Sequence, residues 1–242
     1  MKKILISLTA AALMLLMCVS LASPALAAGT APIAENLEIK TYRNVSVGGK
    51  MSAYDPDGDV VSYEITTQPV KGKIVQGEDG SFTYTPNDNK RGKDYFGYKA
   101  VDAEGNVSQE ATVIIRIEKQ KKDVCYEDMN GRAEEYAAVA LSENNIFTAE
   151  MIGGEYCFGP DKTVSRGEFL SMCMLTAGEP LINGVMSTGY EDVDAMPYWM
   201  QQYVATAVMR GVSGREESEN VFRADEPISR NEAMSMLNRA LG

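Results

Sequence analysis

Residues 164–168 read Val-Ser-Arg-Gly-Glu, and residues 228–232 read Ile-Ser-Arg-Asn-Glu, so one pattern occurs twice in the chain. In both stretches a serine stands three positions before a glutamate, and apolar residues follow. This is the sequence pattern of a capping box, in which the serine hydroxyl accepts a backbone N–H and the glutamate reaches back to the serine N–H. Each stretch therefore predicts the start of a short helix.

The duplication extends beyond the two helix starts. Tyr126-Glu127-Asp128-Met129 returns as Tyr190-Glu191-Asp192-Val193, and Phe158-Gly159-Pro160-Asp161 returns as Phe222-Arg223-Ala224-Asp225. The helical stretches between these elements align with a two-residue shift that keeps apolar residues on one face. We predict two copies of one helix-loop-helix unit, named here copy 1 (residues 121–180) and copy 2 (residues 181–242).

Copy 2 contains the clearest helix. Trp199, Tyr203 and Ala207 recur at helical spacing, and Arg210-Gly211 is typical of a helix end. Copy 1 has Ala133 where copy 2 has Trp199, and it lacks the glycine that ends the first helix.

The chain ahead of Gln120-Lys121-Lys122 has a different period. Apolar residues alternate with polar ones in four runs, and turn signals rich in Asp and Gly separate the runs. These runs are centred on Tyr63, Tyr84, Tyr98 and Ile115. We predict that residues 28–120 form a Greek-key β-sandwich of the immunoglobulin type, so the whole chain is β followed by α.

Residues 1–27 have the pattern of a secretory signal peptide. Lys2 and Lys3 precede an apolar run, and Ala25-Leu26-Ala27 supplies small residues for cleavage. No later run reaches the 18 or so apolar residues of a membrane-spanning helix. We therefore expect a mature chain that begins at Ala28, is secreted and has no membrane span.

The composition excludes several functions. The 242 residues include 23 Lys and Arg, 34 Asp and Glu, and no His, for a net charge of −11. Without histidine there is no Ser-His-Asp triad and no imidazole base, so an enzyme would have to use carboxylates. The acidic balance also argues against nucleic acid as a partner.

Arg166 and Arg230 stand on the first turns of the two predicted helices. Unpaired N–H groups and the helix dipole favour an anion there, so an arginine could complete a site for carboxylate or phosphate. The alternative is that each arginine pairs with a nearby acid. The candidate acids are Glu127, Asp128, Glu191 and Asp192.

The ordered elements of residues 123–242 resemble the S-layer homology module. That family has an aromatic-x-Asp-Val opening, a Trp-containing helix ending in Gly-Ile or Gly-Val, a Phe-x-Pro-Asp loop and a helix start Thr-Arg-Ala-Glu. The resemblance implies non-covalent anchoring to a secondary cell-wall polysaccharide, often carrying pyruvate ketals, at the bacterial cell wall or S-layer surface. By position, the polymer-binding residues would be Arg166, Arg230, Ser165, Ser229, Glu168, Glu232, Asp128, Asp192 and Trp199.

Family members usually carry three repeats about a pseudo-threefold axis, whereas this chain shows two. The resemblance leaves three possibilities: another chain bearing such repeats completes the assembly, two repeats suffice, or binding is weak.

Residues 28–120 resemble the bacterial Ig-like, cadherin-like domains of surface proteins, through Asp55-Pro56-Asp57-Gly58-Asp59 and Gly80-Ser81-Phe82-Thr83-Tyr84. If the acidic turn and the Asp102–Asn106 turn lie at one end of the sandwich, their oxygens could bind Ca2+. The candidate ligands are Asp55, Asp57, Asp59, Asp102 and Glu104. The alternative is two ordinary turns with solvated acids.

Three cysteines follow the predicted leader: Cys125, Cys157 and Cys173. We expect Cys173 to be a buried thiol, and a disulfide between Cys125 and Cys157 is one alternative for the other two.

Three functions remain. The leading hypothesis is a non-catalytic surface protein that displays an Ig-like domain. The second is a calcium-dependent adhesin or carbohydrate-binding protein that acts through that domain. The third, an enzyme using paired carboxylates, has no sizeable domain left to carry it.

Overall fold

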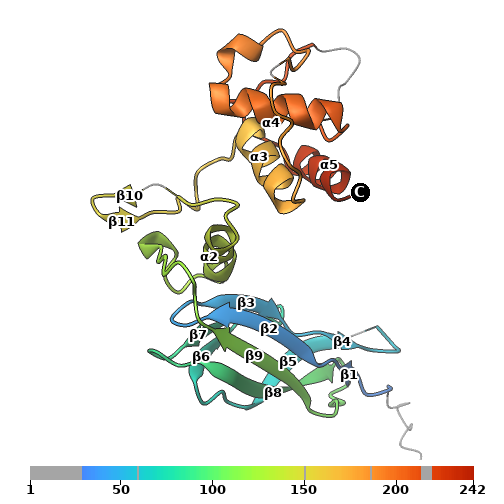
Figure 1. The fold of residues 1–242 in the computed structure, drawn as a ribbon. Helices are drawn as coiled ribbons and strands as arrows, with labels where there is room; N and C mark the ends of the chain where they lie inside the picture. The colour runs from blue at the N-terminus through green and yellow to red at the C-terminus, as the bar shows by residue number, and fades with distance from the viewer. Residues whose placement is uncertain (1–28, 59, 150, 186, 214–219) are drawn as a thin grey trace, which may run out of the picture.

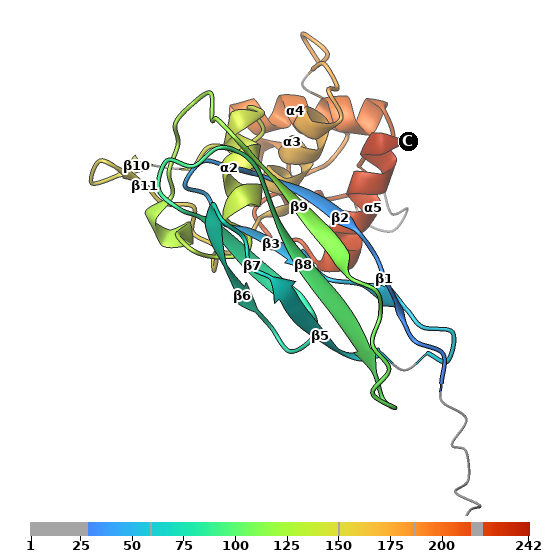
Figure 2. The same ribbon diagram turned by 90° about the horizontal axis from the view of Figure 1, so that it is seen from below.

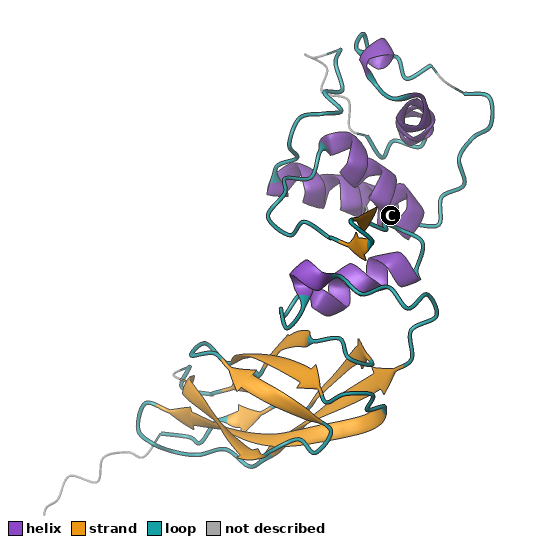
Figure 3. Cartoon of the chain, turned by 90° about the vertical axis from the view of Figure 1, so that its left-hand side faces the viewer, coloured by secondary structure: helices purple, strands orange, loops and turns teal. Residues whose placement is uncertain are grey.

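The structure is a computed structural model. It describes residues 29–58, 60–149, 151–185, 187–213 and 220–242. The described chain forms three tiers, with β-strands at one end, helix α2 in the middle, and helices α3, α4 and α5 at the other end (Figures 1 and 3). The predicted signal peptide lies outside the described residues.

Two sheets form the first tier. One has the strand order β2-β9-β8-β5 and the other β3-β7-β6, and a short β1-β4 pair lies beside them. Every pair is antiparallel except β2 with β9. The strands are β1 (Ile33–Ala34), β2 (Leu37–Tyr42), β3 (Val47–Lys50), β4 (Ala53–Tyr54), β5 (Val60–Thr67), β6 (Gly72–Gln76), β7 (Ser81–Pro86), β8 (Gly92–Asp102) and β9 (Ala111–Glu118).

The sandwich core follows from the period-2 alternation of the sequence. In β7 and β9 every second side chain is buried, because successive residues of a strand point to opposite faces. Both sheets contribute to one core, in which the rings of Phe82 and Phe96 meet edge-to-face at 5.1 Å. The predicted β-sandwich is therefore present, and Figure 2 shows its strands running along the length of this tier.

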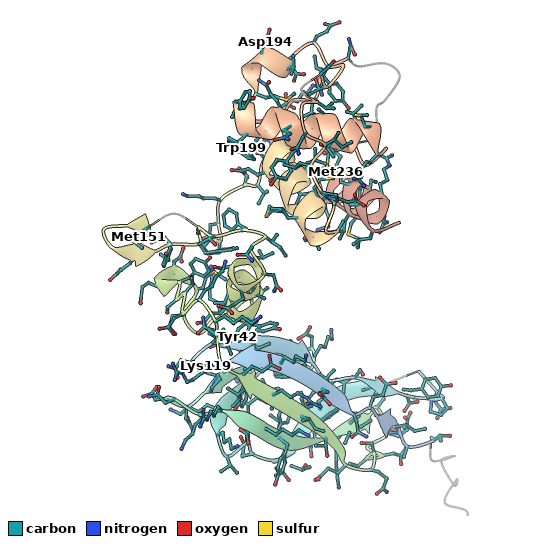
Figure 4. All side chains as sticks on the ribbon, viewed as in Figure 1. Tyr42, Lys119, Met151, Asp194, Trp199 and Met236 are labelled. Carbon is teal, nitrogen blue, oxygen red and sulfur yellow. The ribbon has the colours of Figure 1, made fainter. Side chains whose placement is uncertain are left out.

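Helix α2 (Glu135–Glu143) packs directly on the end of the sandwich. Gly48 N–H donates to Ala133 O (2.8 Å), and Tyr136 N–H donates to Ser46 O (3.0 Å). The ring of Tyr136 lies 5.4 Å from that of Tyr42, which Figure 4 places at the edge of the sandwich facing α2. The first half of copy 1 thus shares a core with the sandwich.

The residues of that shared core come from both sides of the predicted seam at residue 120. They are Val45, Val124, Tyr126, Met129, Ala138, Val139 and Ala149.

The third tier contains α3 (Arg166–Thr176), α4 (Tyr198–Met209) and α5 (Arg230–Leu241). All three helices contribute to one core, with Leu170 and Met174 packed among Met200, Val204 and Met236. Helix α3 belongs to copy 1 by sequence, but it packs with copy 2.

The connection between α2 and α3 contains a two-stranded hairpin of β10 (Met151–Ile152) and β11 (Glu155–Tyr156). Figure 4 labels Met151, the first residue of β10. Where the structure describes it, the C-terminal part is mainly helical, with this short hairpin and two 3-10 turns besides the predicted helices.

The buried face of helix α4 differs from the face on which the sequence places Trp199, Tyr203 and Ala207. The buried positions are Met200, Val204 and Ala207, spaced four and three positions apart, whereas Trp199 is 51% exposed. The helix ends at Arg210-Gly211 as predicted, with Gly211 at φ 72°. Copy 1 uses Asn145 at φ 58° in the same role, because asparagine also tolerates the left-handed conformation.

Candidate functional site

An aspartate holds the loop ahead of the second helix in both copies. In copy 1, the two carboxylate oxygens of Asp128 accept the N–H groups of Phe158 (2.9 Å) and Gly159 (2.7 Å). In copy 2, Asp192 accepts those of Phe222 (2.9 Å) and Arg223 (2.7 Å). The duplicated sequence therefore builds the same contact twice.

The surroundings of the two aspartates also match. The rings of Tyr126 and Phe158 lie 5.4 Å apart, and those of Tyr190 and Phe222 lie 5.5 Å apart. Desolvation opposes ionisation of the exposed Asp128, but the N–H donors of Gly159 and Phe158 outweigh it and hold the pKa of that carboxyl below its usual value. Asp128 and Asp192 thus act as loop anchors.

Both predicted capping boxes are present. The hydroxyl oxygens of Ser165 and Ser229 each accept the N–H of the glutamate three positions on, at 3.3 Å. The carboxylates of Glu168 and Glu232 accept the serine N–H groups at 3.0 and 2.9 Å. These four residues fix where α3 and α5 begin.

Arg166 is used inside the protein. Its Nε donates to Phe222 O (2.9 Å), Nη1 pairs with Glu232 Oε1, and the guanidinium lies 5.4 Å from the centre of the Phe222 ring. The interpretation that each arginine pairs with an acid thus holds for Arg166, but its partner is Glu232 of the other copy rather than one of the four nearby acids.

The first turn of α3 also contacts copy 2 through its backbone. Arg166 N–H donates to Glu226 O (2.9 Å), and Gly167 N–H donates to Ala224 O (2.9 Å). With the capping box, these bonds satisfy all four N–H groups that a helix start leaves open. An anion therefore finds no free N–H at the start of α3.

Arg230 occupies the equivalent position on α5 and differs sharply. Among the residues that the structure describes, its guanidinium has no recorded hydrogen bond or ion pair, and the N–H groups of Arg230 and Asn231 have no recorded acceptor. The side chain is exposed. The start of α5 therefore keeps a free cation beside two free N–H donors.

Two further features lie on the same tier. A pocket of ≈ 120 Å³ lies between Asp192 and the loop that it holds. Its lining residues include Asp192, Met196, Arg223 and Glu226. Trp199 is exposed on α4 with its ring edge-to-face to Tyr203 at 6.1 Å, and Figure 4 labels it on that helix. An exposed tryptophan can stack on the apolar face of a ligand ring.

The two acidic turns of the sandwich meet at the N-terminal end of the described chain. Thr30 N–H donates to Asp57 Oδ2 (2.7 Å), and Asn106 Nδ2 donates to Gly29 O (3.1 Å). Glu104 also approaches this point, since a Cβ added to Gly29 would lie 3.3 Å from Glu104 Oε2. The expected proximity of the two turns is therefore observed.

Half of the eight carboxylate oxygens of Asp55, Asp57, Asp102 and Glu104 accept protein donors. Asp55 Oδ1 accepts from Asp57 and Gly58, and both oxygens of Asp102 accept from Asn106. Asp55 Oδ2 is buried without a partner. Within the described residues no group of three or more acids and thiols is arranged to hold a metal ion, and Asp59 lies outside them.

The three described cysteines are free thiols, so Cys125 and Cys157 form no disulfide. Cys173 is buried as expected, and burial raises the pKa of its thiol to about 11. No cysteine chemistry contributes to the site.

Sequence reasoning missed the partners of Arg166. The backbone partners of Arg166 are Phe222 O and Glu226 O, which carry no residue-type signal. The duplication predicts that both arginines have equivalent local surroundings, but it gives no indication that one copy contacts the other. The contrast between Arg166 and Arg230 is visible only in the structure.

Comparison with solved structures gives partial, low-scoring likenesses. An endo-fucoidan hydrolase of glycoside hydrolase family 107 matches at 15% identity and TM-score 0.29, over 38% of this chain and 17% of the hydrolase. The SrpA adhesin from Streptococcus sanguinis matches at 22% and 0.31, over 41% and 63% of the respective chains. Human protocadherin-24 EC1-2 matches at 18% and 0.30, over 37% and 53%. This chain therefore spans less than two thirds of each of these proteins.

No curated protein matches the chain. Within the described residues, no helix combines the length and the apolar character needed to cross a membrane. Two family models match, that of the bacterial cadherin-like domain over residues 29–119 and that of the S-layer homology domain over residues 189–234. The second domain indicates association with the cell surface and its wall polysaccharide, and the first supports a role in adhesion or binding. The chain thus combines a bacterial cadherin-like domain with an S-layer homology domain.

Proposed function

We propose that this is a secreted, non-catalytic protein that the α3–α5 tier anchors to an anionic, pyruvylated secondary cell-wall polysaccharide. The observation that carries the proposal is the free start of α5, within the residues matched to the S-layer homology domain. Arg230 offers a bidentate donor, and the adjacent N–H groups and the helix dipole favour the same negative charge.

Because the chain is acidic, binding of an anion requires a local cation such as Arg230. The chain as a whole carries a net charge of −11, so a polyanion would be repelled by most of its surface. A pyruvate ketal presents one compact carboxylate, which a single arginine with two N–H donors can bind. Trp199 and the pocket beside Asp192 and Arg223 would contact neutral sugar rings.

Arg166 has a different role in this proposal. Its guanidinium is held by Phe222 O and Glu232, so we assign it to positioning the loop of copy 2. Ser165, Ser229, Glu168, Glu232, Asp128 and Asp192 shape the loops and helix starts around the polymer. The sandwich is then the domain displayed from the wall.

Co-sedimentation with wall sacculi tests the proposal. Wild-type protein should pellet with sacculi that carry the secondary polymer and should stay in solution after the polymer is stripped. Arg230→Ala should lower the bound fraction, by roughly tenfold in affinity for one lost charge-assisted pair. Arg239→Ala, which removes an exposed arginine from the last turn of the same helix, is the matched control. The proposal would be overturned if the same fraction of protein pelleted with and without the polymer and with and without the Arg230 side chain.

A second candidate function is calcium-dependent binding by the sandwich. The buried, unpartnered Asp55 Oδ2 favours it, together with the approach of Asp57 and Glu104 to Gly29. The acids Asp55, Asp57, Asp59, Asp102 and Glu104 would supply the hard oxygen ligands that Ca2+ takes. We expect millimolar Ca2+ to raise the unfolding temperature of the wild type and not of Asp55→Asn. An unchanged wild-type temperature would contradict this candidate.

A further inference from the structure

The contact between the two copies has a donor side and an acceptor side. The donor side is the start of α3, where the N–H groups of Arg166 and Gly167 and the Arg166 guanidinium point to copy 2. The acceptor side is the loop of copy 2, with the carbonyl oxygens of Phe222, Ala224 and Glu226, the Phe222 ring and the Glu232 carboxylate.

The same chain carries an unused donor side. It lies at the start of α5, where the N–H groups of Arg230 and Asn231 and the Arg230 guanidinium have no recorded partner among the described residues. The capping box of α5 has the same geometry as that of α3, so these donors are held in the same arrangement.

The chain also carries an unused acceptor side, in copy 1. The equivalent atoms are the carbonyl oxygens of Phe158, Pro160 and Lys162, and within the described residues none of them has a recorded donor. Asp128 holds this loop as Asp192 holds the loop of copy 2. The Phe158 ring is half-buried, and Glu168, the counterpart of Glu232, is exposed without an ion pair in the described chain.

We propose that the start of α5 docks on the 158–162 loop of a second copy of this chain, head to tail, by the same contacts that join α3 to copy 2. Arg230 would then lie over Phe158 and pair with Glu168 of the neighbouring molecule. Because donor and acceptor are different surfaces, the contact is heterologous, and it generates either a closed ring or a filament.

Two molecules suffice for closure if the α5 start of each reaches the loop of the other. Four helix starts and four loops then alternate around the assembly. A second copy of this chain fits the unused donors, because it carries the matching acceptors in its own 158–162 loop. The contact between α3 and the loop of copy 2 already shows the same donors and acceptors paired.

The contact uses protein groups alone, so it does not depend on the wall polymer. The polymer and the neighbouring molecule would bind the same donors at the start of α5, so they would compete for this site. The two proposals are separable at Glu168, because a carboxylate contributes to the arginine pair of the neighbour but not to binding of an anionic sugar.

Sedimentation velocity of the full mature chain, without polymer, tests the inference over a range of protein concentrations. The wild type should associate as its concentration rises. Arg230→Pro removes the guanidinium and one N–H while keeping the helix start, because proline is accepted at the first helical position. Glu168→Gln removes the pairing charge while keeping a capping-box residue. Each variant should weaken association by roughly tenfold or more.

Arg239→Ala is the matched control and should associate like the wild type. The inference is overturned if the wild type stays monomeric at every concentration. It is also overturned if the wild type associates and neither Arg230→Pro nor Glu168→Gln weakens it. Circular dichroism of both variants should match the wild type, which separates lost association from lost folding.

Discussion

Copy 1 and copy 2 have the same loop anchor and the same helix starts, yet their helices pack in different places. Both helices of copy 2, α4 and α5, share one core. In copy 1, α2 packs on the sandwich and α3 packs on copy 2. A sequence repeat thus specifies local geometry, while the available apolar surface decides which helices form a common core.

Leu170→Ala should have the largest effect on the unequal packing of the two copies. Leu170 lies in copy 1 by sequence but is fully buried in the core of α3, α4 and α5. We expect a loss of about 2–5 kcal/mol, the usual cost of truncating a buried leucine. Hydrogen exchange should accelerate in α4 and α5 and not in α2. Leu175→Ala, at an exposed position of α3, should have little effect. Equal acceleration in α2 would mean that copy 1 unfolds as one unit.

Glu135→Ala tests the other half of copy 1. Glu135 is buried, and its Oε2 accepts the N–H groups of Ser46 (2.9 Å) and Gly131 (3.0 Å). Leaving these donors unpaired should cost about 2–4 kcal/mol. Hydrogen exchange should increase in α2 and β3 and remain unchanged in α4 and α5. The exposed neighbour Glu134 provides the control Glu134→Ala, and an equal loss from that change would refute the role given to Glu135.

The same residue predicts a pH dependence. Burial raises the pKa of Glu135 above its usual 4.5, against the effect of its N–H donors. Between the unfolded and folded pKa values the folded chain binds more protons, so the contribution of Glu135 to stability falls as pH rises through that window. Glu135→Gln keeps an acceptor and does not titrate. The stability of the wild type relative to Glu135→Gln should therefore decrease as pH rises from about 4.5, and a constant difference in urea unfolding would contradict this.

Asp128→Ala and Asp192→Ala compare the two anchors directly. Each change removes a carboxylate that accepts two N–H groups, so each should cost about 1.5–3 kcal/mol. The effects should separate, with faster amide exchange at Phe158 and Gly159 in one variant and at Phe222 and Arg223 in the other. Asp161→Ala and Asp225→Ala remove acids from the same loops as controls. Exchange that increases in both loops for either variant would show that the anchors are coupled.

The smallest expected effect concerns the helix ends. Asn145 and Gly211 both have positive φ after the first helix of their copy. Asn145→Gly should stabilise the chain and Gly211→Asn should destabilise it, each by about 1 kcal/mol or less, because glycine adopts this conformation without a Cβ clash. Thermal unfolding measures both, and shifts of the same sign would contradict the equivalence.

Much of the fold could be predicted from the sequence, because alternation and capping are local signals. The strands around Tyr84 and Ile115, the helix starts at Ser165 and Ser229, and the end of α4 at Gly211 are confirmed. Helical spacing groups Trp199 with Tyr203 and Ala207, but it does not determine which of them is buried, and the structure exposes Trp199.

The packing of α2 and α3 could not be predicted. It depends on backbone carbonyls and on shape, as in the contacts of Ala133 with Gly48 and of Arg166 with Glu226. Of the candidate site, the sequence indicates which residues recur, but not that Arg166 is engaged while Arg230 is free.

The attachment of α2 to the sandwich also has a mechanical consequence. Gly48 with Ala133, Ser46 with Tyr136, and Ser46 with Glu135 join the two tiers side by side. These bonds oppose rotation of the sandwich relative to α2 at residue 120, so a pull between the sandwich and the α3–α5 tier is carried across this joint. Residues 159–163 connect the two helical cores, and the carboxylate of Asp128 holds the start of this connection at Gly159 N–H. A force on the sandwich would therefore reach the α3–α5 tier through α2 and the segment that follows it.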